Sequence, residues 1–119
     1  MSKSQKFFVN IEQIKSLVRK MGGCFVTDMI SVNEQKINFM YREVPDENRP
    51  DSGWRFFAGF EDDKYINDPK NTHIFEVNTV ANYDPDIISF LDSPYNTAFE
   101  RNQETGKFEQ VFDFEFPQD

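Results

Sequence analysis

Cys24 and His73 are the single cysteine and the single histidine of the chain, so they are its one possible pair of thiol nucleophile and imidazole base. A thiolate that an imidazole activates can attack a carbonyl carbon, which is the chemistry of a small hydrolase. Cys24 lies in a short apolar run, and His73 immediately precedes another. Such positions are typical of a buried structural cysteine and of a histidine at a strand edge. The sequence favours structural roles for both, with hydrolysis as a minor alternative.

Asn82, Asp84 and Asp86 alternate along the chain as the first ligands of a calcium-binding loop do. The sixth and twelfth positions of such a loop require glycine and glutamate, and here they are Ile87 and Ser93. We therefore expect Asp84 to cap a helix rather than to bind a cation. Because the sequence also lacks zinc-ligand spacing and a phosphate-binding glycine loop, we expect no metal, no cofactor and no catalytic residues.

Glu61, Asp62 and Asp63 are three consecutive acids at the end of an apolar run. Acid catalysis or metal binding would require these carboxylates to converge, and adjacent residues mostly point apart. A solvated loop is the simpler interpretation. Exposed acids can also contact basic groups of a protein partner without converging.

Trp54 and Arg55, seven residues before these acids, are of the types enriched at binding hot spots. Neighbouring residues of a strand face opposite sides, so one can pack in the core while the other is exposed. Core packing is the simpler interpretation for Trp54, and Arg55 could pair with a nearby acid. Alternatively, the Trp54 region forms the floor of a small-ligand pocket.

The charge of the chain is distributed unevenly. Residues 1–45 carry seven Lys and Arg against four Asp and Glu, a net of +3, whereas residues 84–119 carry two against nine, a net of −7. An acidic second half repels phosphate backbones and anionic membranes, so we expect neither nucleic-acid nor membrane binding. The total of −8 suits a basic protein partner, although solubility alone also explains it.

The length of 119 residues predicts a single domain over residues 1–119, and its 14 phenylalanines supply material for a hydrophobic core. Cys24 has no second cysteine with which to form an internal disulfide, which fits a reducing compartment. The apolar run at residues 7–9 is too short for a signal peptide, and no later run reaches transmembrane length. We expect a cytoplasmic, soluble protein.

The first element expected is an N-terminal amphipathic helix. Asn10 and Gln13 have the spacing of a capping box, and Gly22 and Gly23 follow as a stop signal. The apolar residues between them recur at helical spacing: Ile11, Ile14, Leu17, Val18 and Met21. A second helix near residues 85–92 is predicted by Asp84 as N-cap and Pro85 at the first helical position.

Strands are expected over residues 24–26, 36–43, 54–58 and 74–77, followed by a hairpin whose arms are residues 98–101 and residue 108 onward. In the last strand, alternation places four phenylalanines on one face: Phe108, Phe112, Phe114 and Phe116. It places three acids on the face that sees water: Glu109, Asp113 and Glu115. The class expected is α+β with a mainly antiparallel sheet.

The segment DSGWRFFAGFEDD (residues 51–63) resembles the signature of the bacterial immunity protein 33 family. The similarity continues through FMYRE (39–43) before it and VNTVANYDPDI (77–87) after it, and ends with LDSP (91–94) and AFER (98–101). These linked motifs span about residues 24–112, and their order makes the resemblance specific.

The resemblance implies a non-enzymatic protein that binds and neutralises a cognate polymorphic toxin. On this basis we expect a toxin domain with a basic surface as the partner. The candidate contact residues are Trp54, Arg55, Glu61, Asp62, Asp63, Glu109, Asp113 and Glu115. The oligomeric state stays open, and the alternative is a small-ligand-binding or regulatory domain with no toxin partner.

Overall fold

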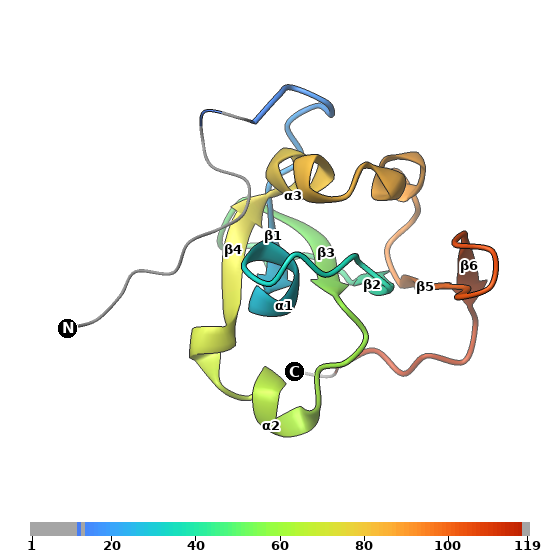
Figure 1. Cartoon of the computed structure of the whole chain (residues 1–119). Helices are drawn as coiled ribbons and strands as arrows, with labels where there is room; N and C mark the ends of the chain where they lie inside the picture. The colour runs from blue at the N-terminus through green and yellow to red at the C-terminus, as the bar shows by residue number, and fades with distance from the viewer. Residues whose placement is uncertain (1–11, 13, 118–119) are drawn as a thin grey trace.

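The strands expected from the sequence join into one mixed sheet with the order β4-β1-β3-β2-β5-β6 (Figure 1). The computed structural model describes residue 12 and residues 14–117. The strand bounds are β1 (Gly23–Thr27), β2 (Phe39–Arg42), β3 (Asp51–Phe57), β4 (Thr72–Glu76), β5 (Thr97–Arg101) and β6 (Phe108–Val111). β3, the Trp54 strand, pairs in parallel with β1, and every other neighbouring pair is antiparallel. The expected α+β class with a mainly antiparallel sheet is confirmed.

Short helices connect the strands. Their bounds are α1 (Asp28–Ser31), α2 (Asp63–Ile66), α3 (Val77–Tyr83) and the 3₁₀ helices η2 (Pro69–Asn71) and η3 (Pro85–Phe90). The helical turn η3 begins where the sequence predicts, because the Asp84 carboxylate accepts a hydrogen bond from the Asp86 amide at 3.2 Å. None of the helices in the described part of the chain has the length and apolar character needed to cross a bilayer.

α3 begins at Val77, the last residue of the strand expected at residues 74–77, so that strand ends one residue early. Val77, Val80 and Ala81 are fully buried and lie on one side of the helix, at i, i+3 and i+4. Valine has only a modest helix propensity, so packing against the sheet outweighs it here.

The expected N-terminal amphipathic helix is not seen. Three of the residues that predict it, Asn10, Ile11 and Gln13, lie outside the described residues, and residues 14–22 contain no helix. The side chains of Asn78 and Asn82, which lie one helical turn apart on α3, bind the backbone of this segment instead.

These two asparagines bind the segment through both the oxygen and the nitrogen of their side-chain amides. Asn78 Oδ1 accepts hydrogen bonds from the backbone amides of Leu17 (2.7 Å) and Val18 (3.0 Å). Asn82 Oδ1 accepts one from the Lys15 amide at 2.9 Å, and both side-chain NH₂ groups donate to the Lys15 carbonyl. Backbone groups that a helix would pair internally are therefore satisfied by α3, which favours an extended segment.

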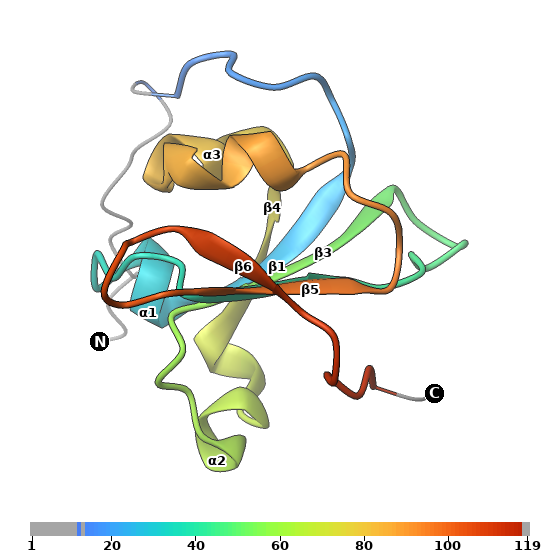
Figure 2. The ribbon, with the colours of Figure 1, turned by 90° about the vertical axis from the view of Figure 1, so that its right-hand side faces the viewer.

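The two faces of the sheet are covered differently (Figure 2). α3 lies over one face, and α2 and the C-terminal segment (residues 112–117) lie on the opposite side. The core under α3 contains the fully buried side chains of Val26, Met40, Trp54, Phe56, Val77, Val80, Ala81 and Ile87. On the opposite side, which we call the back face, the pairing of β2 with β3 brings together Phe39, Tyr41 and Phe57.

The chain leaves the sheet after Val111 and crosses the back face. Phe108 joins the core, Phe112 is 86% exposed, and the Phe114 ring packs against Tyr41 with ring centroids 4.9 Å apart. The expectation that the four phenylalanines share one face of a strand is wrong, because the strand ends first and the segment turns toward the back-face rings.

Candidate functional site

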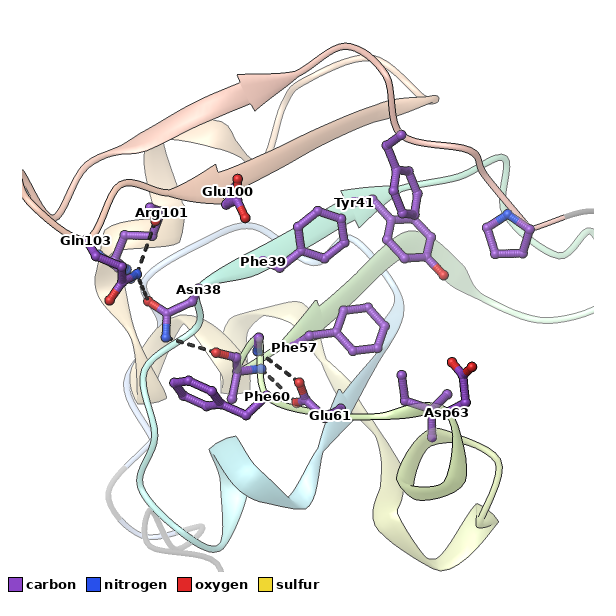
Figure 3. Close-up of a pocket in the computed structure, with 15 residues that line it drawn as sticks. Asn38, Phe39, Tyr41, Phe57, Phe60, Glu61, Asp63, Glu100, Arg101 and Gln103 are labelled. Carbon is purple, nitrogen blue, oxygen red and sulfur yellow. Dashed lines mark hydrogen bonds between the residues drawn. The ribbon is translucent and has the colours of Figure 1, made fainter.

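A groove of about 690 Å³ opens on the back face between α2 and the C-terminal segment (Figure 3). Phe39, Tyr41 and Phe57 form its floor, and Phe114 and Pro117 form one wall. The opposite wall consists of the loop after β3 and the start of α2: Ala58, Gly59, Phe60, Glu61, Asp63 and Ile66. The described chain therefore places a largely aromatic surface beside the loop that follows the Trp54 strand.

The aromatic floor is fixed by strand register. Phe39 is paired with Phe57 across β2 and β3, and the Tyr41 and Phe57 rings stack with centroids 5.8 Å apart and an interplanar angle of 16°. Phe114 covers this layer from the C-terminal segment, 5.1 Å from the Phe39 ring. Ring pairs at these separations stabilise one another beyond simple area burial, so the floor is well ordered.

Tyr41 contributes a polar atom to this apolar floor. Its side chain is buried (8% exposed), its hydroxyl points into the groove, and it forms no hydrogen bond with any described residue (Figure 3). Burial, followed by the negative charge of Glu43, raises the pKa of Tyr41 to about 12. The hydroxyl thus stays protonated at neutral pH and can donate a hydrogen bond to a molecule in the groove.

Glu61 fixes the loop at the groove wall. Its carboxylate accepts hydrogen bonds from the backbone amides of Ala58 (2.7 Å) and Gly59 (2.8 Å) and from the Thr27 hydroxyl. Gly59 has φ +96°, a conformation that glycine adopts without strain. The loop is held tightly, and yet it presents the Phe60 side chain 67% exposed.

Asp62 and Asp63 follow at the start of α2. The Asp62 carboxylate caps this helix by accepting from the Tyr65 amide at 2.8 Å and is exposed to solvent. Asp63 is exposed and lines the groove, as does Glu100 from β5. The three consecutive acids do not act as one cluster, because Glu61 is turned inward while the other two face solvent.

Trp54 and Arg55 are both buried, on opposite sides of β3. The Trp54 indole is stacked on Phe56 in the core and donates to the Leu91 carbonyl at 3.1 Å. Arg55 is 5% exposed and forms ion pairs with Glu43 (2.6 Å) and Asp51 (2.8 Å). Neither side chain is presented to solvent in this structure.

The Arg55 ion pairs shift the titration of Asp51. Burial alone would raise the pKa of Asp51, but hydrogen bonds from Arg55 and from the amides of Asp46 and Gly53 outweigh it and hold that pKa well below its usual range. Burial would lower the pKa of Arg55, and its bonds to Asp51 and Glu43 raise it instead. These charges stabilise one another inside the fold.

The remaining predicted contact residues, Glu109, Asp113 and Glu115, are exposed at the C-terminal end and do not line the groove. Glu109 accepts a hydrogen bond from the side chain of Asn102 at 3.2 Å. Of the eight predicted residues, the groove thus brings together Glu61 and Asp63, with Asp62 adjoining.

Arg101 joins two of the sequence motifs in a second buried ion network. It is 7% exposed and donates to Asp84 at 2.9 Å and to Asp86 at 3.0 Å. It also donates to the carbonyls of Ile37 and Gly106, both at 2.9 Å. Asp84 and Asp86 are therefore occupied by an arginine and a helix cap, as expected for a cap rather than a cation site. Among the described residues no group of three or more His, Cys, Asp and Glu side chains is placed to hold a metal ion.

Cys24 and His73 have separate partners. The buried Cys24 thiol donates to the Phe75 carbonyl at 3.3 Å, and His73 Nδ1 lies 2.8 Å from a carboxylate oxygen of Asp28. Burial raises the pKa of the Cys24 thiol far above its ordinary value. Because the thiolate is the nucleophilic form, this environment disfavours thiol catalysis.

The groove residues Tyr41, Phe57 and Phe60 were not among the predicted contact residues. A signal existed in the sequence, because residues 39–41 and 54–57 place large apolar side chains at both odd and even positions, so both faces of the sheet are apolar. What covers the second face depends on the path of residues 112–117, which local patterns do not specify.

Comparison with known proteins identifies the family of the chain. The family model for the immunity protein Imm33 domain matches residues 24–112, which include β2 through β6 and all but the first residue of β1. No curated protein and no solved structure matches the chain. The matched region is more than half of the sequence and agrees with the motifs at residues 39–43, 51–63 and 77–101. The chain therefore belongs to the immunity protein Imm33 family.

Proposed function

We propose that this protein neutralises a cognate toxin by binding it as a folded unit, without chemistry of its own. The observation that carries the proposal is the family match over residues 24–112, because an immunity family implies a toxin protein as partner. The environment of Cys24 supports the non-enzymatic part, since a buried thiol with a raised pKa is poorly suited to nucleophilic attack.

We further propose that the toxin presents a basic surface and that the two proteins meet in the cytoplasm. The net charge of −8 and the exposed carboxylates of Asp62, Asp63, Glu109, Asp113 and Glu115 support this choice. Complementary charge accelerates association and selects among partners, whereas buried apolar contacts control the lifetime of the complex. The association rate should therefore fall as salt is raised, with a smaller change in dissociation rate.

The test uses the toxin domain encoded in the same gene cluster. Co-expression of this chain should rescue growth of cells that produce the toxin, and an inactivated toxin should bind the purified chain with a Kd in the nanomolar range, about −12 kcal/mol. Reversing the charge of Asp62, Asp63, Glu109 and Glu115 together should slow association. If that variant binds at the unchanged rate, the acidic-surface mechanism is wrong; if the unsubstituted chain neither binds nor rescues, the immunity function itself is wrong.

A second candidate is a small-ligand or regulatory domain with no toxin partner. The groove of about 690 Å³ with an apolar floor and the Tyr41 hydroxyl favours it, because ligand sites have this size and lining. The pocket floor is then Tyr41 and Phe57 rather than Trp54. A thermal-shift screen of nucleotides, sugars and metal ions tests this candidate, since a ligand at a hundred times its Kd adds about 2.7 kcal/mol to the free energy of unfolding.

A further inference from the structure

We propose that the groove on the back face is the docking site for the toxin, and that it receives an apolar side chain flanked by lysine or arginine. This inference rests on the proposed function and specifies the contact surface. The anchor of the partner would lie on the Phe39, Tyr41 and Phe57 floor. Its basic neighbours would meet the acids at the rim.

The first observation in favour of this docking site is that apolar side chains at the groove are exposed. Phe60 is 67% exposed and Ile66 is 41% exposed, and they stand beside a floor of three aromatic rings. Apolar side chains that stay exposed beside an aromatic groove can pack against an apolar side chain of a partner. Aromatic anchors in desolvated centres also supply most of the energy of protein interfaces.

The Tyr41 hydroxyl supplies a second and independent observation. The side chain is more than nine-tenths buried, its oxygen points into the groove, and no described residue accepts its proton (Figure 3). Because no buried side-chain oxygen or nitrogen of the described residues lacks a hydrogen-bond partner, this hydroxyl is open to solvent and is available to a carbonyl oxygen of a docked molecule. The main chain of a docked protein segment provides such carbonyls, whereas a simple hydrocarbon ligand does not.

Charge at the rim defines the flanking residues of the partner. Asp63 and Glu100 line the groove with exposed carboxylates, and the charges of the exposed Asp62 and Lys64, which flank Asp63 along the chain, offset each other. Arg101 is the one basic residue among the lining side chains, and the carboxylates of Asp84 and Asp86 neutralise it. The rim therefore has an excess of negative charge, which is complementary to lysine and arginine.

The rigidity of the loop favours binding through it. Three hydrogen bonds to the Glu61 carboxylate and one from Asn38 Nδ2 to the Ala58 carbonyl (2.9 Å) hold the loop in the position that exposes Phe60. A surface that is already ordered loses little conformational entropy when it binds.

The decisive experiment measures the affinity of groove variants for the inactivated toxin domain of the same gene cluster. We expect Phe60→Glu to weaken binding by at least about tenfold, because it removes an apolar contact in the groove. Asp63→Lys should weaken binding to a similar extent, because it reverses a charge at the rim. Tyr41→Phe removes only the hydroxyl and should weaken binding by about threefold to tenfold. Two matched controls lie outside the groove: Val44→Glu, at a side chain 63% exposed, and Glu47→Lys, at an exposed acid. Both should bind within about twofold of the unsubstituted chain.

Photocrosslinking provides a readout that does not depend on affinity. The photoreactive residue p-benzoylphenylalanine in place of Phe60 should crosslink to the toxin domain, and in place of Val44 it should not. Unchanged affinity of all three groove variants, or a crosslink from position 60 to a second copy of this chain, overturns the docking site while leaving the immunity function intact. A complete lack of binding by the unsubstituted chain overturns the proposed function, and the docking role with it.

Discussion

Arg101→Met tests whether the buried ion network stabilises the fold. The substitution keeps an unbranched apolar side chain over the Phe108 ring, which lies 4.3 Å from the guanidinium carbon, but removes the charge. Among the described residues, it leaves the Asp84 carboxylate, whose side chain is 5% exposed, with donors from the Ile37 and Asp86 amides only. Removing one partner of a buried ion pair costs about 3–5 kcal/mol. The remaining amide bonds place the expected loss near the lower end, about 3 kcal/mol.

A loss of this size is a large part of the stability of a typical domain, which is about 5–15 kcal/mol. At this chain length it corresponds to a decrease in Tm of about 12 °C. Urea unfolding followed by circular dichroism measures the change directly, and an unchanged m value shows that the unfolding transition stays comparable. Arg19→Met is the matched control, because Arg19 pairs with Asp92 at 2.7 Å while both side chains are mostly exposed. It should cost less than about 1 kcal/mol.

A double-mutant cycle separates the ion pair from packing. Combining Arg101→Met with Asp84→Asn removes the unpaired buried charge, so the double variant should be more stable than the sum of the two single losses by about 1–3 kcal/mol. Strict additivity, or an Arg101→Met loss no larger than that of the Arg19 control, would refute the view that these charges stabilise each other.

Three further outcomes follow from the contacts around Asp51, Cys24 and the two asparagines of α3. The pKa of Asp51 is depressed in the folded state, so its contribution to stability is present above the ordinary carboxyl pKa of about 4 and is lost as the pH falls further. Asp51→Asn should therefore give a shallower loss of stability in acid titrations, and an unchanged slope would contradict the pairing with Arg55. The Cys24 thiol should react with Ellman's reagent on the order of a hundredfold more slowly in the folded protein than in urea, because burial raises its pKa. Equal rates in the two conditions would mean that the thiol is accessible in the folded protein. Asn78→Ala with Asn82→Ala should accelerate tryptic cleavage within residues 15–20 severalfold, as seen by mass spectrometry, because the segment loses its backbone partners. Cleavage at the original rate would show that other contacts hold it.

Local interactions explain what the sequence predicted well. Asp84, the expected N-cap, caps η3 by accepting a hydrogen bond from an amide two residues away. Alternation along β3 correctly separates Trp54 from Arg55 onto opposite faces. In each case the deciding atoms lie within a few residues, so composition and spacing carry the information.

Contacts between residues far apart in the chain explain the features that the sequence did not predict. The segment before β1 has helical spacing, but Asn78 and Asn82, some sixty residues later, take its backbone hydrogen bonds. The side of β3 that carries Arg55 is closed by Glu43 and Asp51 rather than open to solvent. The groove in turn exists because the chain bends after Val111, and no periodicity within one element reports such a bend.

The strand order has a consequence for synthesis of the protein. β2 lies between β3 and β5, and its residue Tyr41 is paired with Ala98, so the ribosome makes the second neighbour of this strand long after the first. Such distant pairing slows folding and leaves the edge of β2 unpaired in the meantime. The floor of the groove is translated early and its Phe114 wall late. A truncated product that ends before β5 can form the hairpin of β2 and β3, but it lacks the Phe114 wall of the groove.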